Sequence, residues 1–309
     1  MSTPATGEQH VLRLESGGTT VTAVVAELAA SLRRVRVGEV EIVQDYGADA
    51  LPSGGSGIVL VPWPNRIRDG RWTWEGDVQQ LDLTEPAKGN ASHGLLRNTG
   101  YRVTDRSESA VTLSATVFPQ HGYPFHLDTS VRYSLTETGL EVVHGVHNVG
   151  DATAPFGVGC HPYLRVGDTP MRDLVVTVSG DRMVETDERS LPVREVPVDG
   201  TPQDLRRGAA LRDLDLDTAY TGLETVEGRV RHRLTAPDGR AVELHADPVF
   251  AWAQVFTNPV YATDEGRIDA VAIEPMTCPA DAFNSGTGLL RLEPGEQWGA
   301  GWGISYLAG

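Results

Sequence analysis

Two titratable residues of the sequence each stand beside a proline at the end of a strand-like stretch. The apolar residues 270–273 run directly into Glu274. A carboxyl group in that position is partly desolvated, and desolvation raises its pKa toward the range in which a general base works. His161 follows the glycine-rich residues 157–160, and Pro162 fixes the backbone after it. An imidazole held there titrates near neutrality, as a proton donor must.

The same residues also have purely structural explanations. Glu274 fits a salt-bridged carboxylate at a strand end, and His161 fits a core histidine whose nitrogens are satisfied by neighbours. His93 belongs to a His-Gly pair, which is equally typical of a turn. Residue type and position alone leave these alternatives open.

The segment 62–67, Pro-Trp-Pro-Asn-Arg-Ile, combines a cation with a flat aromatic ring. The face of Trp63 can stack on the C–H groups of a sugar ring, and Arg66 can donate paired hydrogen bonds to hydroxyls. The alternative is a core tryptophan beside an arginine whose stem covers apolar surface. This segment therefore suits a sugar site without proving one.

Acidic residues gather in the segment 213–224, where Asp217 lies in an alternation of acids and leucines. The alternation is explained equally well by a solvated strand face. The spacing imitates a calcium-binding loop, but Thr218 occupies the position that needs glycine, so we expect no metal there. Cys160 and Cys278 are too few for a disulfide framework and lack zinc-site spacing.

The elements that must position these residues are predicted to be short strands. Residues 127–135 and 140–147 alternate, and residues 230–234 and 241–245 flank an Asp-Gly hairpin signal. Turn signals recur roughly every ten residues, which is typical of an all-β sandwich or barrel. The segment 22–34 fits either an amphipathic helix or a strand.

Composition narrows the class of partner. The 309 residues carry 26 Lys and Arg against 42 Asp and Glu, a net charge of −16, which disfavours nucleic acid and anionic membranes. Residues 1–9 show no secretory signal, and the longest apolar run, 21–30, is too short to span a bilayer. We expect a cytoplasmic, single-domain protein over 1–309, with residues 1–18 a loose N-terminal segment.

Five segments, in their order along the chain, resemble the aldose 1-epimerase (galactose mutarotase) family. They are PWPNRI at 62–67, HG at 93–94, GCHPY at 159–163, LDTAYTGL at 216–223 and EPMTCPADAFN at 274–284. No single motif is specific, and the match rests on their order and spacing. The resemblance implies a large antiparallel β-sandwich in which the segment 22–34 forms strands. It also implies interconversion of the α and β anomers of a free aldohexose such as glucose or galactose, without metal or cofactor. We expect a monomer or homodimer.

The resemblance also implies roles for individual residues. Glu274 matches the base that takes the proton from the anomeric hydroxyl, and His161 matches the acid that protonates the ring oxygen. His93 matches a second histidine near that oxygen. Arg66 and Asp217 match the residues that hold the sugar hydroxyls. We also expect Asn65, Trp63, Tyr163 and Arg97 to bind the substrate.

Other functions stay open at this stage. Residues 93–97 read His-Gly-Leu-Leu-Arg, and an HGxxR run also occurs in hexose-6-phosphate 1-epimerases, where basic residues collect a phosphate. Arg97, Arg68 and Arg71 can serve that purpose, although the net charge of −16 does not by itself attract a dianion. A non-catalytic carbohydrate-binding protein would not need both His161 and Glu274. A glycoside hydrolase ordinarily needs two carboxylates, and only Glu274 stands out.

Overall fold

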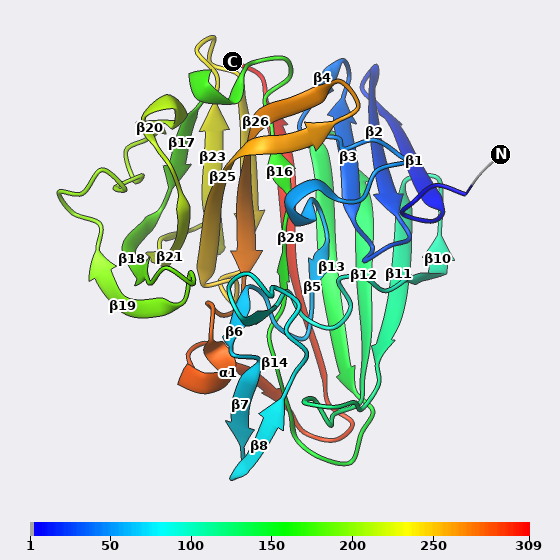
Figure 1. Ribbon diagram of the computed structural model, residues 1–309. Helices are drawn as coiled ribbons and strands as arrows, with labels where there is room; N and C mark the ends of the chain where they lie inside the picture. The colour runs from blue at the N-terminus through cyan, green and yellow to red at the C-terminus, as the bar shows by residue number, and fades with distance from the viewer. Residues whose placement is uncertain (1–2) are drawn as a thin grey trace.

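The computed structural model describes residues 3–309, and its regular structure is almost entirely β-strand (Figure 1). All paired strands run antiparallel in the described residues, so the expected all-β antiparallel sandwich is confirmed. No helix in residues 3–309 is both long and apolar enough to cross a bilayer. The extent of the domain, 1–309, stays a prediction.

The larger layer is a ten-stranded sheet. Its order is β10 (Arg102–Arg106), β11 (Ala110–Val117), β12 (Leu127–Thr136), β13 (Gly139–Asn148), β28 (Gln297–Leu307), β24 (Ala241–Ala246), β23 (Arg229–Thr235), β17 (Val175–Val178) and β20 (Ala209–Ala210), with β22 (Thr225–Val226) also on β23. Strands β12 and β13 cover the alternating stretches 127–135 and 140–147. Their odd-numbered and even-numbered residues, respectively, face the core, as period-two alternation requires.

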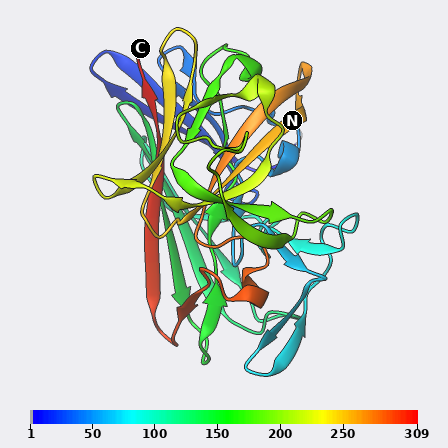
Figure 2. The same cartoon turned by 90° about the vertical axis from the view of Figure 1, so that its left-hand side faces the viewer.

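An eight-stranded sheet carries most of the polar segments singled out in the sequence. Its order is β19 (Pro192–Pro197), β18 (Gly180–Thr186), β21 (Asp217–Leu223), β25 (Trp252–Thr263), β26 (Gly266–Met276), β15 (Gly159–Cys160) and β5 (Val59–Leu60), with β16 (Tyr163–Leu164) also on β26. Figure 2 shows β25 and β26 on the opposite side of the molecule from the long strands of the ten-stranded sheet. The two layers bury the core between them.

Smaller elements complete the fold. A four-stranded sheet contains β1 (Gln9–Ser16), β2 (Thr19–Ala26), β3 (Leu32–Val37) and β4 (Val40–Glu41); the two-stranded pairs are β6 (Arg66–Arg68) with β9 (Asn90–Ser92), β7 (Arg71–Trp74) with β8 (Asp77–Gln80), and β14 (Ala154–Phe156) with β27 (Leu290–Leu292). The helical turns are α1 (Ala282–Ser285), η1 (Ser53–Gly55), η2 (Met171–Asp173) and η3 (Leu211–Asp213). The segment 22–34 is thus divided between two strands, as the family resemblance implies.

The expectation of a loose segment over 1–18 is wrong from Gln9 onward. Every residue of β1 pairs with β2, and the side chain of Leu12 is completely buried. The strand was missed because its polar and apolar residues do not alternate with burial: the polar His10 is buried and the apolar Val11 is exposed. Residues 1–2 lie outside the described residues.

An aromatic cluster fills the space beneath β6 and anchors the loops below the sheets. Trp72 of β7 is buried, packs edge-on against Phe283 of α1 at 4.7 Å between ring centroids, and donates its indole N–H to the Gly122 carbonyl oxygen at 2.9 Å. Its contacts join β7, α1 and the loop that contains Tyr123. The strand β6, which carries Arg66, rests on this base.

We expect Trp72→Ala to lower the free energy of unfolding by about 3–5 kcal/mol, because it leaves a cavity and an unpaired carbonyl. Denaturant unfolding followed by circular dichroism measures the change. Val78→Ala on the paired strand β8 is the matched control, since Val78 is exposed, and should change the free energy by less than about 0.5 kcal/mol. A similar small effect for both variants would contradict the anchoring role.

Candidate active site

Glu274 lies in the buried half of β26 and is 2% exposed. The apolar residues 270–273 before it are buried in the core, so the Glu274 carboxyl group at the end of this run is also shielded from water. One oxygen, Oε1, lies 3.3 Å from His161 Nε2, and Oε2 has no hydrogen-bond partner among residues 3–309. Burial, reinforced by the negative charge of Asp217, raises the pKa of Glu274 well above its ordinary value, against the opposing charge of Arg66.

His161 follows β15, and the turn after it leads into β16 with Tyr163. The imidazole stacks on the Tyr163 ring, with 5.2 Å between centroids and 21° between planes. Its Nδ1 is buried and has no partner in the described part of the chain. Burial lowers the pKa of His161 to about 4. Desolvation thus disfavours the charged form of both His161 and Glu274.

His93 lies directly after β9 and points its ring edge at His161. The two ring centroids are 5.6 Å apart and the planes are at 76°. The backbone of His93 has φ of 62°, in the left-handed region, and its N–H donates to the Asn65 carbonyl oxygen at 2.7 Å. Burial lowers the pKa of His93 well below its ordinary value, and the neighbouring His161, Arg97 and Arg66 act in the same direction. The ring is therefore neutral and can serve as either donor or acceptor.

Arg66 is held in a fixed orientation at the start of β6. Its Nε and Nη2 donate to the two Glu85 oxygens at 2.8 and 3.1 Å, a bidentate pair. The remaining nitrogen, Nη1, donates to Asn65 Oδ1 at 3.3 Å and lies 3.9 Å from Asp217 Oδ2. Glu85 thus leaves one end of the guanidinium directed at Asp217.

Asp217 begins β21, and Gln254 of the neighbouring β25 fixes its carboxylate. Gln254 Nε2 donates to Asp217 Oδ1 at 2.7 Å, and Asn65 Nδ2 donates to Gln254 Oε1 at 3.4 Å. In the strand register Gln254 stands opposite Glu274. Gln254 was not predicted as a site residue. Its sequence signal was a single amide in the otherwise apolar run 252–256, which becomes a buried polar group.

Two predicted sugar contacts are covered by neighbouring side chains. Trp63 is 2% exposed and packs against Phe283 and Tyr123, with ring centroids 5.6 and 6.4 Å away, so the stacking of a sugar on its face stays a prediction. Tyr163 is completely buried, and its hydroxyl accepts from Asn258 Nδ2 at 3.2 Å. Its ring supports that of His161, and its contact with a sugar also stays a prediction.

Arg97 lies next to this group without an acidic partner. Its Nη1 donates to the Ser92 carbonyl oxygen at 3.2 Å, while Nε is buried and unpaired within residues 3–309. Burial lowers the pKa of Arg97, and the charge of Glu85 opposes that change. The structure therefore brings Glu274, His161, His93, Arg66, Asp217 and Asn65 together, with Arg97 at their edge.

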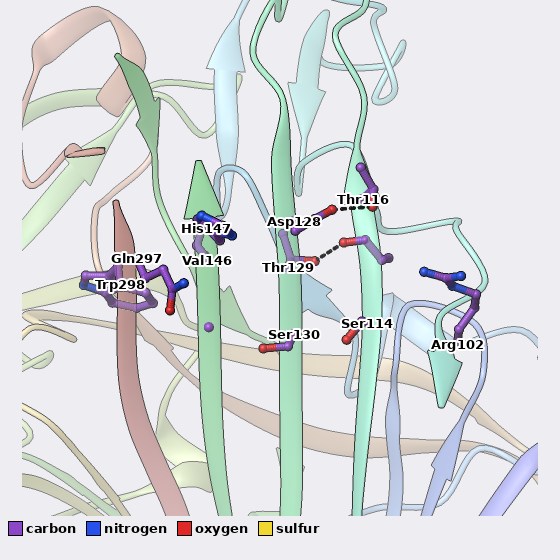
Figure 3. Close-up of a pocket in the computed structure, with 12 residues that line it drawn as sticks. Arg102, Ser114, Thr116, Asp128, Thr129, Ser130, Val146, His147, Gln297 and Trp298 are labelled. Atoms are coloured by element: carbon purple, nitrogen blue, oxygen red, sulfur yellow. Dashed lines mark hydrogen bonds between the residues drawn. The ribbon is translucent and has the colours of Figure 1, made fainter. Parts of the chain in front are cut away.

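A hollow of about 10 Å³ lies beside one part of this group. Its lining includes Asn65, Arg66, Ser190, Asp217 and Gln254, but not Glu274, His161 or His93. A roomier hollow of about 300 Å³ lies on the outer face of β11, β12, β13 and β28 (Figure 3). It contains none of the predicted site residues. Within residues 3–309, no group of three or more His, Cys, Asp or Glu side chains is arranged to hold a metal ion.

The antiparallel β-sandwich is a galactose-mutarotase-like fold, as in the similar solved structures. Comparison with known proteins gives the family. The family model described as "Aldose 1-epimerase" matches residues 10–305, and the chain belongs to the aldose 1-epimerase family. Membership supports a sugar epimerase, an isomerase, without specifying the sugar.

One curated relative and two solved structures are similar to this chain. The uncharacterized protein YihR of Escherichia coli K12 is 31% identical over 296 residues, which cover 93% of each chain. Among solved structures, the GalM/aldose epimerase homologue from C. elegans has a TM-score of 0.82 at 16% identity, covering 97% of this chain and 99% of that one. Galactose 1-epimerase from Lactobacillus acidophilus NCFM has a TM-score of 0.75 at 19% identity, covering 98% and 99%. At these identities the two solved structures show the fold alone.

The burial of Glu274 predicts a pH-dependent stability. Its folded-state pKa is raised, so its stabilising contribution is fully present below the unfolded-state pKa, near 4.3, and is lost as the pH rises through the folded-state pKa. Because glutamine does not ionise, Glu274→Gln should not lose stability as the pH rises. We expect the variant to be more stable than the wild type at pH 8 by roughly 1 kcal/mol or more, since one pKa unit is worth about 1.4 kcal/mol.

Denaturant unfolding of both proteins at pH 5 and pH 8 measures the effect, and the difference should shrink at the lower pH. Glu75→Gln is the control, because Glu75 is an exposed glutamate in the β7–β8 turn. A pH-independent difference between Glu274→Gln and the wild type would show that the carboxyl group is not destabilised by burial.

Proposed function

We propose that the protein is an aldose 1-epimerase that interconverts the α and β anomers of a free aldohexose such as glucose or galactose. One observation carries the proposal. The carboxyl group of Glu274 and the imidazole of His161 lie 3.3 Å apart in a buried site, next to Arg66 and Asp217. A neighbouring acid and base suit a reaction that moves one proton off and another on to a single hemiacetal.

The proposed reaction uses the ion-pair form of the site, in which proton transfer from Glu274 to His161 across 3.3 Å leaves Glu274 ionised and His161 protonated. Glu274 takes the proton from the anomeric hydroxyl, and His161 gives its proton to the ring oxygen as the C1–O5 bond breaks. The electron pair of the O–H bond forms the aldehyde C=O, and the pair of the C1–O5 bond stays on O5. After the C1–C2 bond rotates, the reverse transfers close the ring on the other face of the carbonyl. Both residues return to their starting states.

The remaining groups hold the sugar. Arg66 keeps one nitrogen directed into the site, while Asp217, fixed by Gln254, offers acceptor oxygens to hydroxyl groups. Neutral His93, beside His161, can donate a hydrogen bond to the ring oxygen as negative charge develops there. The presence of both an acid and a base favours catalysis over sugar binding without turnover.

Replacement of the two reacting groups should separate chemistry from binding. We expect Glu274→Gln to reduce anomer exchange to the uncatalysed rate while sugar affinity changes by only a few fold. His161→Asn should lower the rate about 10²–10⁴-fold, the usual contribution of general acid–base catalysis. NMR exchange spectroscopy on glucose and galactose measures the rates. A Glu274→Gln rate within tenfold of the wild type would remove Glu274 from the role of base.

A hexose 6-phosphate is the second candidate substrate, and Arg97 is the observation that favours it. Its guanidinium lies partly buried without a carboxylate partner within residues 3–309, as an anion-binding residue would. We nevertheless propose a neutral sugar, since the net charge of −16 opposes the approach of a dianion.

Arg97→Ala decides between the two substrates. For a neutral-sugar enzyme we expect glucose turnover within about twofold of the wild type and no acceleration with glucose 6-phosphate. For a phosphosugar enzyme, kcat/KM for glucose 6-phosphate should fall tenfold or more, because a charge-assisted hydrogen bond is lost. Arg102→Ala, which removes an exposed arginine on β10, controls for the loss of one positive charge.

A further inference from the structure

Ser190 lies in the wall of the site hollow, although neither it nor its neighbours belong to the segments that resemble the family. Its hydroxyl donates to Asp217 Oδ2 at 3.3 Å. Gln254 already occupies the other oxygen, Oδ1. We propose that Ser190 is a further sugar-binding residue of the proposed epimerase, and that Lys88 positions its hydroxyl. The inference rests on the proposed function and names two residues that determine which sugar hydroxyl is recognised.

Lys88 is the sole lysine of the sequence and is half-buried in the loop between β8 and β9. Its Nζ donates to Ser190 Oγ at 2.5 Å, and no carboxylate lies within 4.0 Å of it in the described residues. An ammonium group can only donate hydrogen bonds. It therefore takes a lone pair of Ser190 Oγ and leaves the Ser190 proton free for Asp217 or for a sugar oxygen.

The loop from Glu85 to Asn90 contacts Arg66 directly and Asp217 through Ser190. Glu85 fixes Arg66 through the bidentate pair, and Lys88, three residues later, acts on Asp217 through Ser190. One short segment thus sets the distance between the guanidinium and the carboxylate. A purely structural lysine would gain more from a carboxylate partner than from a serine hydroxyl.

The turn that carries Ser190 is clamped to this loop. Arg189 Nε donates to the Lys88 carbonyl oxygen at 2.8 Å, and Asn90 Nδ2 donates to the Arg189 carbonyl oxygen at 3.1 Å. With this support Ser190 adopts φ of 57°, a left-handed conformation that costs a serine free energy. Asn65 and His93, on the other side of the site, share that conformation. Such backbone positions concentrate at ligand sites, where the surrounding structure maintains them.

The hollow beside Asp217 places Ser190 next to any group that reaches Asp217 Oδ2. At about 10 Å³ it is far below the roughly 300 Å³ at which ligand pockets begin, so side chains must rearrange when a sugar enters. A sugar hydroxyl that binds Asp217 Oδ2 either displaces the Ser190 hydroxyl or accepts its proton. In both cases Ser190 and Asp217 together determine where one sugar hydroxyl can bind.

Ser190→Gly is the decisive variant, because glycine adopts the left-handed conformation freely and the turn should keep its fold. We expect KM for the accelerated aldose to rise about 5- to 20-fold with kcat within threefold, as for loss of a binding interaction. Lys88→Met should raise KM in the same direction, and Lys88→Arg should restore part of the affinity. Glu75→Gly, at another left-handed residue far from these contacts, is the matched control and should change neither constant.

A panel of monodeoxy sugars gives a readout that a structural role would not move. In the wild type, the deoxy sugar that lacks the hydroxyl recognised by Ser190 should bind more weakly than the parent sugar. In Ser190→Gly this loss of affinity should largely disappear, while the losses for the other deoxy sugars persist. A KM for Ser190→Gly within twofold of the wild type, with every deoxy penalty unchanged, would overturn the proposal while leaving the epimerase function intact.

Amine labelling tests the same contact without turnover. An amine-reactive reagent can modify only Lys88 and the α-amino group, and peptide mass spectrometry separates the two. We expect labelling of Lys88 to accelerate in Ser190→Gly and to change when a saturating aldose is added to the wild type. If no aldose were accelerated, the proposed function would fail, and a sugar-dependent change in Lys88 labelling would still support the binding role. No change in either comparison would refute it.

Discussion

The exclusion of water from the Glu274 carboxyl group is the constraint on which the site depends. A carboxylate in a sheet interior is tolerated only with partners that share or offset its charge. Here the partners are the His161 imidazole at 3.3 Å and, farther off, the Arg66 guanidinium. A two-layer sandwich provides this environment, because β26 is flanked by β25, β15 and β16 and its second half is buried throughout. The sheet thus buries the Glu274 carboxyl group, at a cost in free energy, directly beside the imidazole of His161.

Polar contacts between distant segments then fix the geometry around that pair. Arg66, Asp217 and Gln254 come from three different strands, yet a continuous chain of hydrogen bonds from Glu85 through Asn65 connects them. The loops contribute as much as the strands, since Glu85 belongs to a connection and not to the sheet. The strands set the positions of these residues along the sheet, and the connecting loops orient the side chains at the edge of the sheet.

The sequence predicted the strands whose apolar and polar residues alternate. It predicted side-chain roles less well where a residue type fits both a core and a site. Strands β12 and β13 followed from alternation, whereas β1 did not, because the buried His10 and the exposed Val11 break the alternation of apolar and polar residues. Trp63 lies in the core, although an aromatic beside an arginine suits a core and a binding face equally well. Gln254 and Ser190 were missed because an amide or a hydroxyl becomes informative only when the fold buries it against a charge, as it does against Asp217. Such pairings span tens to hundreds of residues and leave no local pattern.

The opposite pKa shifts of Glu274 and His161 determine where the proton of this pair resides. In water an imidazole is more basic than a carboxylate, so a proton shared between them resides on the imidazole. Burial raises the pKa of Glu274 well above its ordinary value and lowers that of His161 to about 4, which reverses this preference. The neutral pair, with the proton on Glu274, is therefore the favoured form of the buried site, and proton transfer from Glu274 to His161 produces the ion pair that the proposed reaction uses. An epimerase must run the same proton transfers in both directions, and a pair that shares one proton supplies an acid and a base for ring opening and recovers both on ring closure.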